Sequence, residues 1–297
     1  MTGDHRLARD LAVQAGRRLL ALRARGGDPD ALRKAADRLS HEFLTAALAG
    51  HRPGDWVLSE EGKDNPARRT ARRVWIVDPL DGTREFGEPG RTDWAVHVAL
   101  WERDPGAVSA PGGTTPLSPP GAVSARGGTT PPGPSGAVSA PGGTTPPGPP
   151  GRLTAGAVAL PAQGRVLSTL EPPPAPDDRE APGRIRIVVS RSRAPQLVRN
   201  ISDLLGADLL PLGSAGAKVA AVIGGEADAY VHGGGFYEWD TAAPVAVARA
   251  AGFHASRIDG APLAYNQADL LMPDILVCRP AVAGVLLQAI REVTNAP

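Results

Sequence analysis

The chain has 297 residues, and its 32 lysines and arginines almost balance its 31 aspartates and glutamates. A formal net charge of +1 argues against binding to a nucleic acid polymer or to an anionic membrane, because such surfaces demand a strongly basic face. The sequence lacks an apolar stretch of about 18–20 residues that could span a membrane, and it lacks an N-terminal secretory signal. Its single cysteine, Cys278, excludes an internal disulfide. We therefore expect a soluble, cytoplasmic, globular protein.

The first part of the chain combines helices and strands. Apolar residues recur at helical spacing in residues 5–24 and again in residues 35–49. Apolar, β-branched and aromatic runs of strand length then predict four strands, at 74–77, 93–101, 153–160 and 164–170. The N-terminal half is therefore expected to pack two helices against a sheet.

Residues 104–150 separate two of these strands and differ in composition. The segment contains three consecutive copies of a 15-residue unit that begins GAVSA, and 13 of the 31 prolines and 11 of the 36 glycines lie in it. Without aromatic residues and with almost no charge, the segment cannot offset the entropy cost of ordering, so we predict a disordered insertion. A polyproline II docking segment is the alternative, although the prolines lack regular PxxP spacing. Because long loops cost little closure entropy, residues 1–103 and 151–297 are expected to form one unit with an N-terminal metal-binding half and a C-terminal α/β half.

The C-terminal half continues the alternation. Helices are predicted at 196–205, 215–223, 241–251 and 281–293. Strands are predicted at 185–189, 227–231 and 274–278. Mixed helices and strands in both halves indicate an α/β or layered α+β enzyme.

Carboxylates are concentrated where three apolar runs end. Glu60 and Glu61 follow the first run, Asp78 and Asp81 lie in the segment WIVDPLDGT, and Asp240 lies far downstream. A turn or N-cap role explains a single Asp-Gly pair well, but it does not explain all three segments together. Functional groups are often placed where an element ends, so we expect these side chains to share a site.

The middle segment is the most informative. Pro79 is expected to end the strand, so that Asp78 and Asp81 straddle a turn and point into one small volume. Gly82 permits close approach of the backbone, and Thr83 offers both an N-cap oxygen and a hydroxyl for catalysis. Amide groups at a helix start form a natural cradle for a phosphate.

Acidic ligands without a nearby histidine or cysteine cluster favour hard cations, Mg²⁺ above all. Several carboxylates cannot share a cavity unpaired, so either metal ions neutralise them or their pKa values rise. Two or three Mg²⁺ ions are the simpler solution, and phosphoryl transfer is the chemistry that uses them.

These motifs resemble a known family. The pair Glu60-Glu61, the run WIVDPLDGTREF at 75–86 and the run WDTAAPVAVARAAG at 239–252 resemble the signatures of the inositol monophosphatase superfamily. The resemblance covers nearly the whole chain outside 104–150. It implies a layered αβαβα sandwich and a Mg²⁺-dependent, lithium-sensitive phosphatase.

Two further segments resemble the 3'(2'),5'-bisphosphate nucleotidase branch, which converts 3'-phosphoadenosine 5'-phosphate to AMP. They are VVSRS, which contains Ser190 and Arg191, and GSAGAK, which contains Ser214 and Lys218. Lys218 and Arg191 are expected to face the second phosphate of a bisphosphate nucleotide, and a solvated surface charge is the alternative for each. The resemblance also implies a role in sulfate assimilation, through removal of a by-product.

The resemblance assigns the metal ligands by motif position. Glu60, Asp78 and the backbone carbonyl of Leu80 are expected to hold the first Mg²⁺. Asp78, Asp81 and Asp240 are expected to hold the second. The substrate site is expected to include some of these ligands together with residues of the motifs named above. The expected substrate-binding residues are Glu60, Leu80, Asp81, Gly82, Thr83, Ser190, Arg191, Ser214, Lys218 and Asp240.

The resemblance also assigns the catalytic groups. Gly82 and Thr83 would supply amides to the transferred phosphate, and the Thr83 hydroxyl, partnered with Asp37, would orient and deprotonate the attacking water. Glu61 would support that water or a weaker third metal. Asp37 departs from the family pattern, because the Asp and Thr that usually precede it are absent. An N-cap aspartate that opens the helix 35–49 is therefore the alternative.

Other functions are weighed against this one. A haloacid dehalogenase-type phosphatase is excluded, because its paired acids are two residues apart and Asp78 and Asp81 are three apart. Inositol 1-phosphate and fructose 1,6-bisphosphate stay open as substrates. A non-catalytic sensor of nucleotide phosphates is the alternative from another class. The oligomeric state also stays open, with a homodimer as one option.

Overall fold

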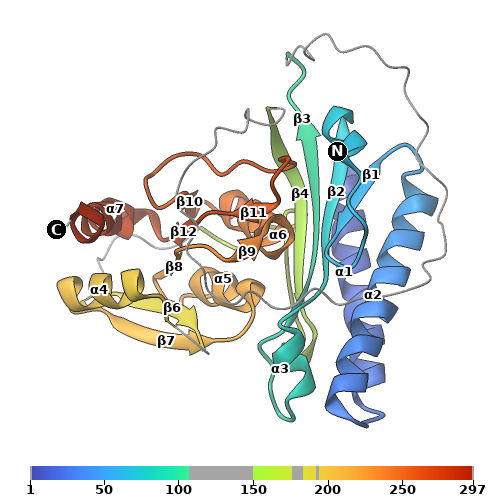
Figure 1. Cartoon of the computed structure of the whole chain (residues 1–297), viewed down its shortest axis with the longest axis horizontal. Helices are drawn as coiled ribbons and strands as arrows, with labels where there is room; N and C mark the ends of the chain where they lie inside the picture. The colour runs from blue at the N-terminus through green and yellow to red at the C-terminus, as the bar shows by residue number, and fades with distance from the viewer. Residues whose placement is uncertain (1, 107–149, 176–182, 192–193, 296–297) are drawn as a thin grey trace.

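The structure, a computed structural model, describes residues 2–106, 150–175, 183–191 and 194–295. Most of the segment predicted to be a disordered insertion lies outside these residues. The described residues form five layers, in the order helices, sheet, helices, sheet, helices (Figure 1). Three separate hydrophobic cores lie between the layers. This αβαβα arrangement confirms the predicted fold class.

The first sheet has the strand order β1-β2-β3-β4-β5, with β1 parallel to β2 and the other neighbours antiparallel. Its strands are β1 (Trp56–Ser59), β2 (Arg73–Asp81), β3 (Ala95–Arg103), β4 (Gly151–Leu160) and β5 (Arg165–Ser168). Helices cover both faces, so the central strands read as nearly continuous apolar runs.

Helices α1 and α2 pack on one face of this sheet, and α5 and α6 pack on the other. Their bounds are Thr2–Arg23, Pro29–His51, Ala215–Ile223 and Glu238–Ala250. Because successive strand residues point to opposite faces, Val74 and Ile76 of β2 enter the core shared with α5 and α6. Trp75 and Val77 enter the core under α1 and α2.

The second sheet has the order β10-β12-β8-β6-β7, in which β6 is parallel to both of its neighbours. Its strands are β6 (Arg186–Ser190), β7 (Asp208–Leu212), β8 (Ala229–His232), β10 (His254–Ser256) and β12 (Ile275–Cys278). α5 and α6 lie between the two sheets, and α4 (Gln196–Leu205) and α7 (Pro280–Asn295) cover the outer face.

The remaining elements are short. They are α3 (Thr83–Gly87), the 3₁₀ turns η1 (Pro66–Thr70) and η2 (Pro161–Gln163), and the two-stranded ribbon of β9 (Phe236–Tyr237) with β11 (Leu271–Met272). Among all the described helices, none is both long and apolar enough to cross a membrane.

Most predicted elements are present, with differences at their ends. The helices predicted at 196–205 and 215–223 coincide with α4 and α5. α2 begins at Pro29 instead of residue 35, because the Asp28 side chain accepts the N–H of Ala31 and proline occupies the first helical position. The short strands β1, β7 and β10 were not predicted, and β7 carries a proline, a residue that sheets tolerate at an edge.

The repeat segment lies in the connection between β3 and β4. Arg103 pairs with Gly151 in the antiparallel ladder, and the N–H of Asp104 donates to the carbonyl of Pro150 at 3.0 Å. The neighbouring residue Glu102 pairs with Arg73, the first residue of β2. The connection therefore leaves the sheet at the end opposite to the acidic segment of β2.

Candidate active site

A bulge at the end of β2 orients the two aspartates of the central motif. In the ladder with β3, Asp78 pairs with His97 and Asp81 pairs with Ala95. An advance of three residues along β2 therefore corresponds to two residues along β3, and β2 carries one extra residue. On a regular strand, residues three apart point to opposite faces, and the extra residue brings both carboxylates to the face that α5 covers. The predicted turn at Pro79 is therefore wrong. The strand continues to Asp81, and its proline is tolerated within the bulge.

Asp81 is nearly fully buried and is surrounded by donors. The N–H of Ala215 donates to Oδ1 at 3.2 Å, the N–H of Gly216 donates to Oδ2 at 2.7 Å, and Nε2 of His97 lies 3.1 Å from Oδ2. Burial alone would raise the pKa of this carboxyl, but His97, the Gly216 amide and Lys218 together lower it. Asp81 is therefore held as an anion at the N-terminus of α5, where the helix dipole also favours negative charge.

His97 was missed at the level of sequence, where the acidic site was expected to lack a nearby histidine. The imidazole is fully buried, with Nδ1 3.2 Å from the carbonyl oxygen of Trp239 and 4.0 Å from Oδ2 of Asp78. His97, Asp78 and Asp81 each offer a ligand atom, and these atoms lie within 4.8 Å of one another. The available signal was a lone histidine at an inward position of the apolar strand predicted at 93–101.

Asp78 and Glu60 make the most acidic part of the site. Oδ1 of Asp78 accepts the N–H of Leu80 at 2.9 Å, whereas its buried Oδ2 has no hydrogen-bond partner in the described part of the chain. Burial, together with Glu60 and Asp81, raises the pKa of Asp78 well above its ordinary value. Burial and Asp240 raise the pKa of Glu60 to about 8, although part of the Glu60 surface remains exposed.

Asp240 reaches this cluster from the other half of the chain. α6 begins at Glu238 instead of residue 241, so Asp240 lies in its first turn and accepts the N–H of Tyr237 at 2.6 Å. Burial and the charge of Asp81 raise the pKa of Asp240 to about 7. The four predicted acidic metal ligands therefore meet between β1, β2 and α6.

Asp37 and Thr83 also come together, as the proposed water-activating pair requires. Asp37 lies in the interior of α2, so the N-cap alternative is wrong. The Thr83 hydroxyl lies 3.0 Å from the carbonyl oxygen of Leu80 and 3.4 Å from Oδ1 of Asp37, and its single proton can be donated to either acceptor. Burial and the charge of Glu61 raise the pKa of Asp37 to about 7, and burial also raises the pKa of Glu61.

Gly82, and not Thr83, is the N-cap residue of α3, which corrects the predicted cap role of the threonine. Its φ of 82° is in the left-handed region that favours glycine. A Cβ atom at this position would lie 3.0 Å from Cβ of Ser214 and 3.3 Å from the carbonyl oxygen of Asp93. The loop after β2 therefore packs directly against the start of α5.

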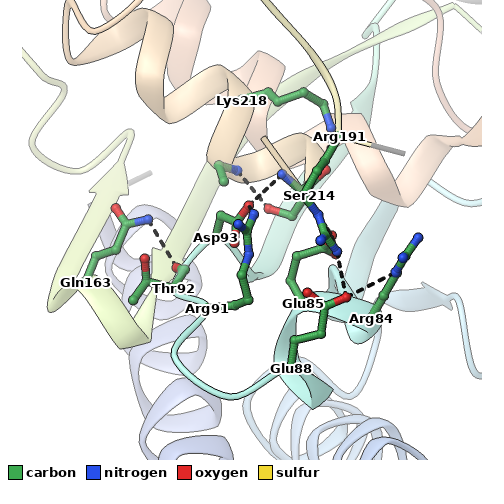
Figure 2. A network of polar contacts seen from close by, with 12 residues as sticks. Arg84, Glu85, Glu88, Arg91, Thr92, Asp93, Gln163, Arg191, Ser214 and Lys218 are labelled. Carbon is green, nitrogen blue, oxygen red and sulfur yellow. Dashed lines mark hydrogen bonds and ion pairs between the residues drawn. The ribbon is translucent and has the colours of Figure 1, made fainter. Parts of the chain in front are cut away.

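Asp93 fixes the start of α5 (Figure 2). Its carboxylate accepts the N–H of Gly213 at 2.7 Å and pairs with Arg91, and its carbonyl accepts the N–H of Ser214 at 3.1 Å. The Ser214 hydroxyl in turn accepts the N–H of Ala217 at 2.9 Å and caps the helix. Because Asp93 lies two residues before β3, this network ties the first sheet to the helix that holds Asp81.

Lys218 lies on the first turns of α5 and is buried, with 4 % of its surface exposed. Its ammonium donates to the carbonyl of Gly213 at 2.5 Å and lies 5.3 Å from the ring centroid of Tyr230. Burial lowers the pKa of Lys218, and the charges of Asp81 and Glu85 oppose this effect. The alternative of a solvated surface charge is therefore wrong for Lys218.

Arg191 follows Ser190, the last residue of β6, and forms ion pairs that the sequence did not suggest. Its guanidinium contacts Glu85 at 3.0 Å and Glu88 at 2.7 Å, both from the segment after β2 (Figure 2). Both carboxylates raise the pKa of Arg191, with Glu88 making the larger contribution. Arg191 is partly exposed but firmly paired, so its charge is held beside the C-terminal end of α3.

Gly216 supplies a test of this packing. A Cβ atom at this position would lie 2.2 Å from Nε2 of His97 and 3.0 Å from Cβ of Ala95. We expect Gly216→Ala to lower the free energy of unfolding by about 1–3 kcal/mol, as overpacking of an interior does. We also expect lower activity, because the backbone N–H of residue 216, which donates to Asp81, is displaced. Urea unfolding measures the first effect. Gly50→Ala, on an open face of α2, is the control, and equal stability of both variants would contradict the packing argument.

Comparison with known proteins places this site in a family. The sequence model described as "Inositol monophosphatase family" matches residues 7–111 and 151–295, which is most of the chain. The protein therefore belongs to the inositol monophosphatase family.

Similar proteins carry a more specific name. The 3'-phosphoadenosine 5'-phosphate phosphatase of Mycobacterium leprae (strain TN) is 44 % identical over 293 residues, which are 98 % of this chain and 94 % of the relative. The protein of the same name from Mycobacterium tuberculosis (strain CDC 1551 / Oshkosh) is also 44 % identical, over 94 % of this chain and 90 % of its own length.

Solved structures agree on the fold. CysQ from Bacteroides thetaiotaomicron, a bacterial member of the inositol monophosphatase family, is 26 % identical and superposes with a TM-score of 0.66 over 94 % of this chain and 98 % of its own. Inositol monophosphatase II from Staphylococcus aureus MSSA476 superposes with a TM-score of 0.70 at 17 % identity, over 100 % of this chain and 98 % of its own.

Proposed function

We propose that this protein hydrolyses the 3'-phosphate of 3'-phosphoadenosine 5'-phosphate and releases AMP and phosphate. The observation that carries the proposal is the 44 % identity, over nearly the full chain, to relatives named for this substrate. The site supports it, because a set of carboxylates that includes the buried Asp78 and Asp81 lies next to a hydroxyl–carboxylate pair and to the cationic groups of Lys218 and Arg191.

The residues of the site fit a metal cofactor. Oδ2 of Asp78 is buried without a donor among the described residues, and the raised pKa values of Asp78, Glu60 and Asp240 reflect carboxylates that lack enough cationic partners. Oxygen donors of this kind suit hard cations, so we propose Mg²⁺, in two or three ions. Glu60, Asp78, Asp81, Asp240 and the carbonyl of Leu80 would hold them. When bound, such ions stabilise the charge that develops in phosphoryl transfer.

The side chains themselves would handle the proton of the attacking water. The Thr83 hydroxyl is within reach of Asp37, whose pKa of about 7 leaves a large fraction ionised and able to accept a proton at neutral pH. Glu61 lies close enough to Asp37 to raise that pKa and is proposed to support the same water. The amides of Gly82 and Thr83 are proposed to hold the transferred phosphate.

The second phosphate of the substrate is proposed to lie toward α5 and β6. Ser214 caps α5, and Lys218 supplies a buried positive charge one turn along the same helix. Ser190 ends the neighbouring strand β6 and Arg191 follows it, where Glu85 and Glu88 hold the guanidinium in place. A monophosphate would leave the second phosphate position empty, so these cations favour a bisphosphate.

The first experiment compares substrates with purified protein and Mg²⁺. We expect 3'-phosphoadenosine 5'-phosphate to exceed inositol 1-phosphate and fructose 1,6-bisphosphate by at least tenfold in kcat/KM, which corresponds to about 1.4 kcal/mol of transition-state preference. An Asp81→Asn variant controls for contaminating phosphatases, and a lithium titration tests the expected inhibition. A higher kcat/KM for an inositol or sugar phosphate would keep the family assignment and refute the proposed roles of Lys218 and Arg191.

Metal binding without turnover of any of the three substrates would instead favour the sensor function. The cytoplasmic location, the role in sulfate assimilation and the homodimer stay predictions, which fractionation, growth on sulfate and sedimentation can test in turn.

A further inference from the structure

A buried polar cluster connects two segments that supply the predicted metal ligands. Its members Arg68, Asn266 and Glu238 are each at most 1 % exposed. Arg68 belongs to η1, in the connection from β1 to β2 that also carries Glu60. Glu238 is the first residue of α6 and lies two residues before Asp240. The cluster therefore touches a segment on each side of the acidic site, although its members have no assigned role there.

Arg68 is the centre of this cluster. Its guanidinium pairs with both carboxylate oxygens of Asp64, at 2.7 and 3.2 Å. It also donates to Oδ1 of Asn266 at 2.5 Å and to the carbonyl of Gln267 at 2.8 Å. Nδ2 of Asn266 donates back to the carbonyl of Arg68 at 3.4 Å. A buried guanidinium is costly without such partners, so these bonds fix residues 266–267 to η1.

Residues 266–267 in turn hold the start of α6. The backbone N–H groups of Asn266 and Gln267 donate to the two side-chain oxygens of Glu238, each at 2.7 Å. The N–H of Glu238 donates to the carbonyl of Leu270 at 3.0 Å. The first helical residue of α6 is therefore held by the same segment that Arg68 contacts.

The backbone of Asn266 shows how tightly this link is held. Its φ of 62° lies in the left-handed region, and among the described residues it is the one residue other than glycine with a positive φ. Such a conformation persists where contacts on several sides enforce it. Here the side chain bonds to Arg68 and the N–H bonds to Glu238, so one residue joins η1 to α6.

We propose that Arg68 is a positioning residue, which through Asn266 fixes the connection that carries Glu60 and Glu61 relative to the first turn of α6, which carries Asp240. This inference rests on the proposed metal site but not on the identity of the substrate. Without the link, the carboxylates on the two sides of the site no longer keep a fixed separation, and cation binding weakens.

The test breaks the link at Asn266 and measures Mg²⁺ binding to the full chain by calorimetry, without substrate. Asn266→Gly removes the side-chain bond to Arg68, while glycine adopts the left-handed φ freely and keeps the N–H that Glu238 accepts. Asn266→Asp keeps an acceptor for Arg68, and aspartate tolerates the same φ. We expect the Kd for Mg²⁺ to rise about tenfold in Asn266→Gly, as loss of supporting groups around a metal site does, and to recover in Asn266→Asp.

Two arginine variants separate the link from general destabilisation. Arg68→Met is expected to raise the Kd at least as much as Asn266→Gly, and the double variant no further than Arg68→Met, because both changes break one contact. Arg257→Met is the control. Arg257 directly follows β10 in the second sheet and pairs with Asp274 at 2.6 Å, and its loss should leave the Kd for Mg²⁺ unchanged.

The outcomes distinguish the failures. An unchanged Kd in Asn266→Gly, with normal binding by the wild type, would overturn the role of Arg68 alone. An equal rise in Arg257→Met would overturn it too, because the effect would then follow from lost stability. No Mg²⁺ binding by the wild type would overturn the metal site as well.

If the variants do not fold, hydrogen exchange of the wild type decides. Coupling between two sites is reciprocal, so a link that favours Mg²⁺ binding must itself be stabilised by Mg²⁺. The amides of Asn266 and Gln267 are expected to exchange more slowly at saturating Mg²⁺, and by a larger factor than the amide of Ile258, which donates to Asp274 at 2.9 Å. Equal slowing of all three amides, or no slowing, would refute the positioning role.

Discussion

Asp78→Asn is expected to lower kcat/KM by at least about 10³-fold, a loss of roughly 4 kcal/mol of transition-state stabilisation, and to make the metal-free protein more stable. The first effect follows from the proposed role of Asp78, which is the one carboxylate assigned to both metal ions. The second follows from burial. Asp78 is 1 % exposed, and its Oδ2 lacks a donor in the described structure.

The gain in stability has a definite sign. The pKa of Asp78 is raised by burial, Glu60 and Asp81, so near pH 7.5 the folded protein must either hold a proton on this group or bury its charge. Both cost folding free energy relative to the unfolded chain, in which the carboxyl ionises freely near pH 4. Asparagine carries no charge and can donate to Glu60, so we expect a gain of about 1–3 kcal/mol in the free energy of unfolding.

Asp228→Asn provides a matched control with the opposite sign. Asp228 is also fully buried, but it pairs with Arg186 at 3.1 Å and Arg279 at 3.4 Å, and its pKa is lowered. Its replacement should destabilise the fold by about 1–3 kcal/mol and leave kcat/KM unchanged. Denaturant unfolding in EDTA measures both variants. A metal-free Asp78→Asn protein less stable than the wild type would contradict the crowding of carboxylates described above.

The metal-free wild type is expected to lose stability between pH 7.0 and 8.5, and Mg²⁺ should remove the part of this loss that comes from the acidic site. Burial raises the pKa values of Asp37 and Asp240 to about 7 and that of Glu60 to about 8. In the unfolded chain these groups ionise near pH 4. Between pH 4 and about 8 the folded state therefore binds more protons, and its stability falls as the pH rises.

The pH window separates this effect from that of the histidines. Burial lowers the pKa of His232 to about 4, so this group adds stability with rising pH only below about 6.5. From pH 7.0 to 8.5 the carboxyl groups dominate, with an expected loss on the order of 2 kcal/mol, or roughly 4–8 °C in Tm. Thermal melts at four pH values, with EDTA or with Mg²⁺, give the comparison. A Tm that is constant or rises with pH in EDTA would show that these carboxyls are not crowded in the metal-free protein.

The fold and the acidic centre were accessible from sequence because each rests on a local pattern. Helical spacing located α4 and α5 to the residue, and the motif around Asp78 and Asp81 identified the site before any geometry was known. The bulge at Pro79 was not accessible, because proline ends a strand as readily as it occupies a bulge. Only the pairing of β2 with β3 distinguishes the two.

The donors around the acidic centre depend on contacts between distant segments. His97 meets Asp81 across a strand register, Arg191 meets Glu85 and Glu88 from another sheet, and Lys218 is buried through packing of α5 between the sheets. Side-chain type and spacing report none of these distances. The sequence could therefore name Lys218 and Arg191 as site residues but not their contacts, and it did not identify His97.

The bond from the N–H of Asp104 to the carbonyl of Pro150 means that the β3–β4 hairpin is closed by the sheet before residues 107–149 begin. Chain added at such a point lengthens a loop whose ends are already together, at roughly 0.6 kcal/mol for each doubling. The acidic segment of β2 lies at the opposite end of the sheet. This hairpin tip is therefore a natural grafting point, where a binding module or a fluorescent reporter could be carried by the enzyme without rebuilding its active centre.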